Sequence, residues 1–112
     1  MRGRGLPEVS VTEVSALLAG GAALIDVREG YEWEAGHAAD AVHLPMGKLS
    51  RQALPAGRPL LVVCHVGGRS AVATDALVRA GVDAANVAGG MDAWQRAGLA
   101  VVTDAGDPGR VV

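Results

Sequence analysis

The chain contains a single cysteine, Cys64, and the residues around it suit a reactive thiol. Cys64 stands where the apolar run 60–63 gives way to a polar segment that contains glycine. A cysteine thiolate is a strong nucleophile and is also open to oxidation. The segment after Cys64 consists of His65, Val66, Gly67, Gly68, Arg69 and Ser70. We therefore expect the chemistry of the protein at this junction.

The segment after Cys64 predicts surroundings that favour the thiolate. Gly67 and Gly68 allow a tight turn in which successive backbone N–H groups converge. A helix that begins near Arg69 directs its first N–H groups, and their partial positive charge, into the turn. The guanidinium of Arg69 adds a permanent positive charge. Together these features predict a pKa of Cys64 below its ordinary value of about 8.5.

Two other interpretations of this segment compete with a reactive thiol. A lone cysteine at the end of a strand is often an inert core residue, but such a residue needs neither two glycines nor an arginine and a helix start after it. A phosphate-binding loop is excluded because the lysine and the glycine spacing of that motif are absent. The role of His65 is left open. It could donate a proton or contact substrate, or it could be an exposed loop residue without a role.

The elements that position Cys64 alternate between strands and helices. Short apolar segments predict strands over residues 23–27, 41–44, 60–63 and 85–88. Helical segments are predicted from a capping box at Ser10 and Glu13 to Gly20, and over residues 28–34, 46–52, 69–80 and 91–97. This alternation predicts an α/β fold with a mainly parallel sheet and helices on both faces. Ligand sites of such sheets lie beyond the carboxyl ends of the strands, where Cys64 falls.

Length and composition limit the classes of protein to consider. The 112 residues, half of them hydrophobic, predict one domain over residues 10–102, with an N-terminal extension over 1–9 and a flexible tail over 103–112. A net charge of -2 argues against a nucleic-acid partner. No stretch approaches the ~20 apolar residues of a membrane span, and no apolar leader follows Arg2 and Arg4. We expect a cytoplasmic protein with no membrane partner.

The single cysteine also bears on disulfides and metals. Cys64 has no second cysteine with which to form an internal disulfide, so the fold does not depend on an oxidising compartment. A metal site built from several cysteines is excluded for the same reason. We expect no metal and no cofactor.

Three blocks of sequence occur in an order and spacing known from one family. The first contains Asp26-Val27-Arg28, Glu32-Trp33, Gly36-His37 and 41–45, the second is the segment 64–70, and the third is 87–94 with Gly98 and Val101. From about residue 10 to residue 101 the chain resembles the single-domain rhodaneses. The resemblance implies a rhodanese-like fold.

The resemblance also implies an activity. Cys64 would attack the outer sulfur of a donor such as thiosulfate, expel sulfite and hold the sulfur as a persulfide. A thiol, cyanide or a protein cysteine would then accept it. Arg69 would favour anionic donors and hold the loop. The remaining loop residues would bind substrate: His65, Val66, Gly67, Gly68 and Ser70.

Other residues of the family blocks are given supporting roles. Asp26 and Arg28 are expected to brace the rim of the site.

Cys64 and Arg69 enclose four residues, whereas the related phosphatases and arsenate reductases enclose five. The shorter loop makes a smaller pocket, which fits one sulfur atom better than an oxyanion.

The chain departs from the family pattern at the turn before the segment 41–45 and at 99–101, where the usual proline is absent. Where the family has a glycine, this chain has Asp40, a residue that tolerates turn conformations. The sequence therefore does not determine how side chains pack near the rim of the site. We expect His37 and His43 to have structural roles, and Trp33 and Trp94 to pack in the core.

Two classes of protein compete with a sulfurtransferase. One is a recognition or regulatory module of rhodanese fold, although such modules often lack the cysteine. The other is a thiol that senses peroxide, although no second cysteine is present to resolve a sulfenic acid. The sequence leaves open the physiological donor, the acceptor and the oligomeric state.

Overall fold

The computed structural model describes residues 5–112, and its centre is a five-stranded sheet. Every pair of neighbouring strands is parallel, and the strand order is β1-β5-β4-β2-β3. The strands are β1 (Glu8–Val9), β2 (Ala23–Asp26), β3 (Ala41–His43), β4 (Leu60–Val63) and β5 (Ala84–Val87). The predicted α/β architecture is confirmed.

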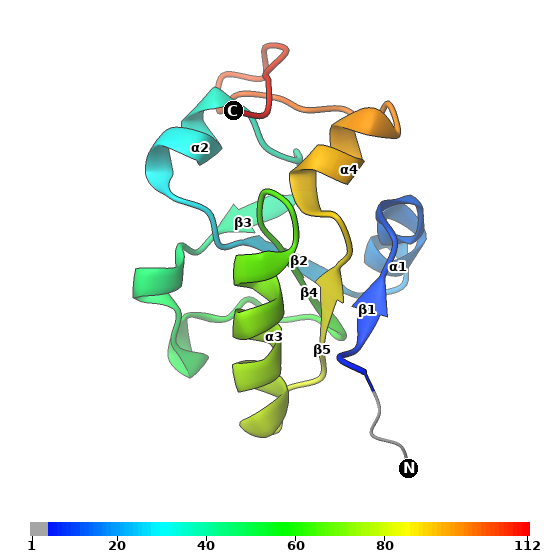
Figure 1. Cartoon of the computed structure of the whole chain (residues 1–112), viewed down its shortest axis with the longest axis vertical. Helices are drawn as coiled ribbons and strands as arrows, with labels where there is room; N and C mark the ends of the chain where they lie inside the picture. The colour runs from blue at the N-terminus through cyan, green and yellow to red at the C-terminus, as the bar shows by residue number, and fades with distance from the viewer. Residues whose placement is uncertain (1–4) are drawn as a thin grey trace.

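Helices cover both faces of this sheet (Figure 1). On one face lie α1 (Val14–Ala19) and α4 (Gly90–Arg96), and on the other lies α3 (Gly68–Arg79). The fourth helix is α2 (Gly30–Ala35). Side chains of successive strand residues point to opposite faces, so Leu61 and Val63 pack with α1 and α4, whereas Leu60 and Val62 pack with α3. All four residues of β4 are buried, because the strand is central and covered on both sides.

One predicted helix is wrong. The segment 46–52 forms two 3-10 turns, Met46–Lys48 and Arg51–Ala53, instead of one helix. Leu49 and Ser50 have extended backbone angles that separate the turns. Leu49 packs against the core on the α3 face, and this contact outweighs the local helical pattern.

The sheet begins before the predicted domain boundary at Ser10. Glu8 and Val9 form β1, which pairs with Asn86 and Val87 of β5. Of the proposed extension 1–9, residues 1–4 lie outside the described residues. No helix within residues 5–112 has the length and apolar character needed to cross a lipid bilayer.

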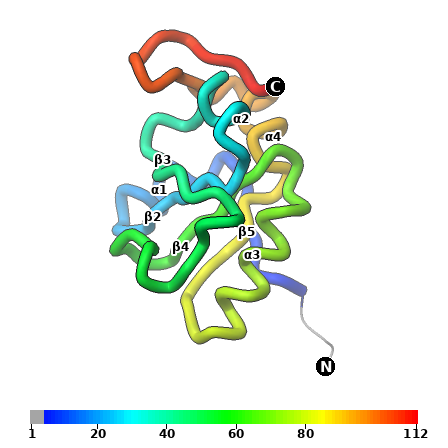
Figure 2. Tube along the Cα trace, turned by 90° about the vertical axis from the view of Figure 1, so that its left-hand side faces the viewer, coloured from blue at the N-terminus to red at the C-terminus, as the bar shows by residue number. Residues whose placement is uncertain are grey.

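The C-terminal residues lie beside α2, and both views place them at the same end of the molecule (Figure 1 and Figure 2). Val102 forms an antiparallel bridge with His37. The Arg110 N–H donates to the carbonyl of Ala35 at 2.9 Å. The segment proposed as a tail therefore contacts the domain through backbone hydrogen bonds.

Candidate active site

Cys64 directly follows β4 at the carboxyl end of the sheet, and three donors surround its sulfur. The Gly67 N–H donates to Sγ at 3.2 Å. The Ser70 N–H and hydroxyl donate at 3.3 Å and 3.2 Å. Gly67 has a φ of 107°, a left-handed conformation that favours glycine and turns the loop into α3. The predicted convergence of N–H groups on one point is present.

These donors determine the acidity of the thiol. Burial raises the pKa of Cys64, because a thiolate loses hydration in the protein interior. The Ser70 hydroxyl and the N–H groups of Ser70, Gly67 and Arg69 outweigh this effect, and the pKa of Cys64 falls below its ordinary value. Among the groups that lower the pKa of Cys64, the Ser70 hydroxyl has the largest effect.

The other loop residues lie differently. Val66 is 65% exposed and His65 is half-buried, and neither side chain is among the groups of residues 5–112 that donate to Sγ. Gly68 is the first residue of α3. The structure thus brings Gly67 and Ser70 to the sulfur, and it leaves Val66 at the outer surface.

Arg69 is paired with a buried carboxylate, Glu32, which is not among the predicted site residues. Its two terminal nitrogens donate to Oε1 and Oε2 of Glu32 at 2.7 Å and 2.9 Å. The bidentate contact with Arg69 lowers the pKa of Glu32 from 4.5 to about 2, against the opposing effect of burial. Glu32 lies on α2, so this pair attaches the Cys64 loop to that helix.

The Glu32–Arg69 pair predicts a loss of stability in acid. Because the folded-state pKa of Glu32 lies below 4.5, the contribution of the pair is present above about pH 4.5 and is lost as the pH falls toward 2. Glu32→Gln is expected to lower the free energy of unfolding at neutral pH by about 1–2 kcal/mol, with Arg69 partly solvated. Denaturant titrations at a series of pH values measure the free energy of unfolding of wild type and of Glu32→Gln. The difference between the two proteins should become smaller in acid.

The matched control is the exposed pair of Arg79 and Asp75 on α3, in which both side chains are more than half exposed. Asp75→Asn should change the free energy of unfolding by less than about 0.5 kcal/mol. An equal cost for the two substitutions at neutral pH would contradict a structural role for the buried pair.

The start of α4 holds the other side of the Cys64 loop. The N–H groups of Met91 and Asp92 donate to the carbonyls of Cys64 and His65 at 2.8 Å and 2.9 Å. This close approach requires glycine at position 90. A Cβ on Gly90 would lie 2.5 Å from both carbonyl oxygens, and its φ of 60° is left-handed.

Gly90→Ala is therefore expected to destabilise the protein by more than the conformational cost alone. The left-handed conformation costs a residue with Cβ about 1–2 kcal/mol, and the clash with two backbone oxygens adds to it. Gly98→Ala is the control, because Gly98 has a φ of 78° and open space around its Cα. Thermal unfolding of both variants should show the larger fall for Gly90→Ala, and equal falls would contradict the clash.

Asp26 and Arg28 form a fully buried ion pair at the end of β2. The Arg28 Nη2 donates to Oδ2 of Asp26 and to the carbonyl of Gly36, both at 2.8 Å. The carbonyl of Arg28 contacts His43 Nε2 at 2.8 Å. These contacts connect the end of β2 to Gly36, which caps the C-terminus of α2, and to β3.

The ring of Trp33 stacks with both histidines of the first family block. Its ring centroid lies 3.5 Å from that of His37 and 4.8 Å from that of His43. The Trp33 Nε1 donates to Asp104 at 3.2 Å, and His37 Nε2 lies 3.3 Å from the same carboxylate. This stack joins α2, β3 and the C-terminal segment.

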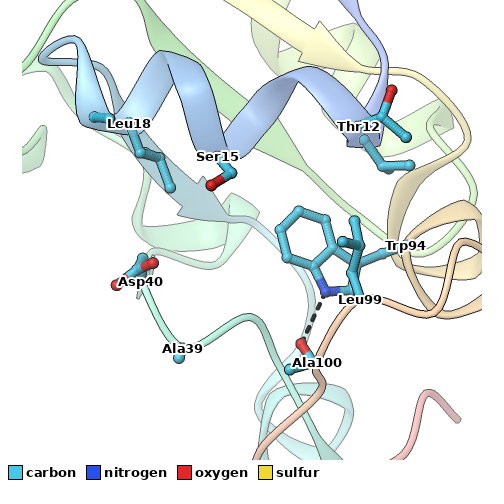
Figure 3. A pocket seen from close by; sticks show the side chains of 10 residues that line it. Thr12, Ser15, Leu18, Ala39, Asp40, Trp94, Leu99 and Ala100 are labelled. Carbon is cyan, nitrogen blue, oxygen red and sulfur yellow. Dashed lines mark hydrogen bonds between the residues drawn. The ribbon is translucent and has the colours of Figure 1, made fainter.

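A separate groove of about 540 Å³ lies between α1 and α4, on the face of the sheet opposite α3 (Figure 3). Trp94 forms one wall, and its Nε1 donates to the carbonyl of Ala100 at 2.9 Å. Asp40, which replaces the family glycine, lies in a turn at the rim of this groove. None of the residues that donate to Cys64 lines it.

The fold and the site together define a class of protein. It is an α/β domain with a parallel sheet, in which the loop after a cysteine directs N–H groups at the sulfur and stabilises negative charge there. The family model of the rhodanese-like domain matches residues 10–97, and the chain belongs to this family. The thiosulfate sulfurtransferase GlpE of Actinobacillus pleuropneumoniae serotype 7 is 35% identical over 86 residues, which cover 74% of this chain and 80% of that protein.

Solved structures agree with this assignment. A rhodanese-related protein from Thermoplasma volcanium has a TM-score of 0.79 and 26% identity, covering 88% of this chain and 99% of that chain. The rhodanese-like domain of an Anabaena protein has a TM-score of 0.76 at 21% identity, covers 88% of this chain and 80% of that chain, and shows the same fold. The expected family and fold are confirmed.

Proposed function

We propose that this protein is a sulfurtransferase that carries a sulfane sulfur on Cys64. The observation that carries the proposal is the convergence of the Gly67 N–H, the Ser70 N–H and the Ser70 hydroxyl on Sγ. The thiosulfate sulfurtransferase relative supports the choice of donor class. The surroundings of Sγ stabilise negative charge on sulfur, which every step of such a transfer requires.

In the first half of the reaction, the Cys64 thiolate attacks the outer sulfur of thiosulfate. A sulfur–sulfur bond forms between Sγ and that atom, and the bond to the sulfonate sulfur breaks. Sulfite leaves with the electron pair, and Cys64 becomes a persulfide with a negative terminal sulfur. The N–H groups at the start of α3 stabilise this charge without rearrangement.

In the second half, an acceptor attacks the terminal sulfur and returns Cys64 to the thiolate. Cyanide would leave as thiocyanate, and a thiol would leave as its persulfide. Because the charge of Arg69 is paired with Glu32, Arg69 acts mainly through the position of the loop and its own N–H. His65, at the outer part of the loop, is the residue we assign to contact with donor or acceptor.

The experiment is intact mass spectrometry of the purified protein after incubation with thiosulfate. The expected result is a gain of one sulfur atom, which is lost again on addition of cyanide. Sulfate, which matches the shape and charge of thiosulfate but has no sulfane sulfur, is the matched control. Because the chain has one cysteine, a gain that cyanide reverses assigns the sulfur to Cys64.

Two other outcomes would replace the proposal. Absence of any gain with thiosulfate, polysulfide or a persulfide donor would favour a recognition module. A gain of oxygen from dilute peroxide, faster than any gain of sulfur, would favour a redox-sensing thiol.

A further inference from the structure

Asn86 is a buried polar side chain on β5 that the proposed mechanism does not use. It is 2% exposed. Its Nδ2 lies 3.3 Å from Oε2 of Glu8 and 3.3 Å from the carbonyl oxygen of Gly67. Glu8 is the register partner of Asn86 on β1, so both side chains emerge on the same face of the sheet. Asn86 therefore lies between the first strand and the Cys64 loop.

The two neighbours determine the orientation of the Asn86 amide. A carboxylate oxygen and a backbone carbonyl only accept hydrogen bonds, so the NH₂ group must face both. Oδ1 is then left without a partner among residues 5–112. An unpaired buried acceptor is unfavourable, and an apolar residue of this size would avoid it. Packing alone therefore does not account for an asparagine at position 86, whereas its NH₂ group is suited to donate to two acceptors.

Gly67 is the loop residue that this contact holds. Its N–H donates to Sγ of Cys64 at 3.2 Å. Its carbonyl accepts hydrogen bonds from the Ala71 N–H at 3.1 Å and from Asn86. The carbonyl that Asn86 contacts belongs to the peptide between Gly67 and Gly68, and the Asn86 contact restrains the plane of this peptide. The N–H that donates to Sγ belongs to the preceding peptide, between Val66 and Gly67.

We propose that Asn86 is a positioning residue for the Cys64 loop, oriented by Glu8, so that the N-terminal strand contributes to the active site. The role rests on the proposed function, in which Cys64 is the nucleophile. Without the amide, the carbonyl of Gly67 has one donor fewer and its peptide can rotate. The two peptide planes share the Cα of Gly67, so a shift of the carbonyl plane displaces this Cα, moves the Gly67 N–H out of line with Sγ and weakens the stabilisation of the thiolate.

The test compares Asn86→Leu with wild type by titrating the ultraviolet absorbance of the thiolate. The expected result is a rise in the pKa of Cys64 equivalent to an acid dissociation constant about fivefold smaller, the equilibrium weight of one net hydrogen bond. Glu8→Ala, which removes the second acceptor from the surface, should give a smaller shift in the same direction. Thr74→Val is the matched control, because it removes another buried and unpartnered polar atom, on α3.

The outcomes separate this role from a purely structural one. A titration of folded Asn86→Leu that superimposes on wild type would overturn the proposal, and so would an equal shift in Thr74→Val. If Asn86→Leu does not fold, the Glu8→Ala titration decides in the same way. A shifted titration in a protein that takes up no sulfur would reject the proposed function and keep the positioning role.

Discussion

Cys64→Ser is expected to abolish sulfur uptake from thiosulfate, with a loss of more than about a thousandfold in the rate of transfer to cyanide. A serine hydroxyl is almost wholly protonated at neutral pH and forms no persulfide. The three donors that face Sγ retain an oxygen acceptor in this variant. The fold should therefore survive, and the lost activity can be assigned to the nucleophile. Thiocyanate production measures the loss.

Ser70→Ala provides the graded comparison. It removes the hydroxyl donor to Sγ and keeps the N–H donor of the same residue. We expect this variant to retain sulfur uptake at a rate reduced by about tenfold, because one of several hydrogen bonds to the thiolate is lost. Full uptake by Cys64→Ser would show that the sulfur is carried elsewhere and would contradict the mechanism.

The largest effect on stability is expected from Asp26→Ala. This substitution leaves the guanidinium of Arg28 without its carboxylate in a position with no exposure to solvent. Removing one partner of a buried ion pair costs about 3–5 kcal/mol, because the remaining charge has lost both its hydration and its counterion. Denaturant unfolding at neutral pH measures this cost.

The control is the double variant Asp26→Leu with Arg28→Met, which removes both charges and keeps apolar volume. Replacing a whole buried pair is often neutral, so the double variant is expected to be more stable than Asp26→Ala alone. Part of the cost will remain, because Arg28 also donates to the carbonyl of Gly36. If the double variant loses as much as the single one, packing around these side chains outweighs their charge.

Much of this fold could be predicted from local patterns. Leu60–Val63 reads as a strand because four apolar residues stand between Pro59 and the polar loop. The capping box at Ser10 also marked a true helix start, and the Ser10 N–H donates to Oε1 of Glu13 at 2.8 Å. The strand β1 was missed, since two residues carry no measurable periodicity.

The thiol loop could be located from the sequence, but its supports could not. Glu32 and Arg69 are 37 positions apart, and Glu8 and Asn86 are 78 positions apart. Their contacts depend on how β1, β5 and α2 are placed by the sheet, which local spacing does not encode. Glu32 belongs to the first family block and to the predicted helical segment 28–34, where the neighbouring residues give no sign of a distant partner.

The depth of Cys64 has a consequence for selectivity among reagents. The residue is 1% exposed, so a reagent must come past the surrounding side chains and loop to contact its sulfur. A linear nucleophile such as cyanide meets less steric hindrance there than a branched thiol or a large electrophile. An added sulfur atom would extend the side chain one atom beyond Sγ. The persulfide should then be easier for bulky acceptors to reach than the free cysteine is for bulky oxidants or alkylating agents.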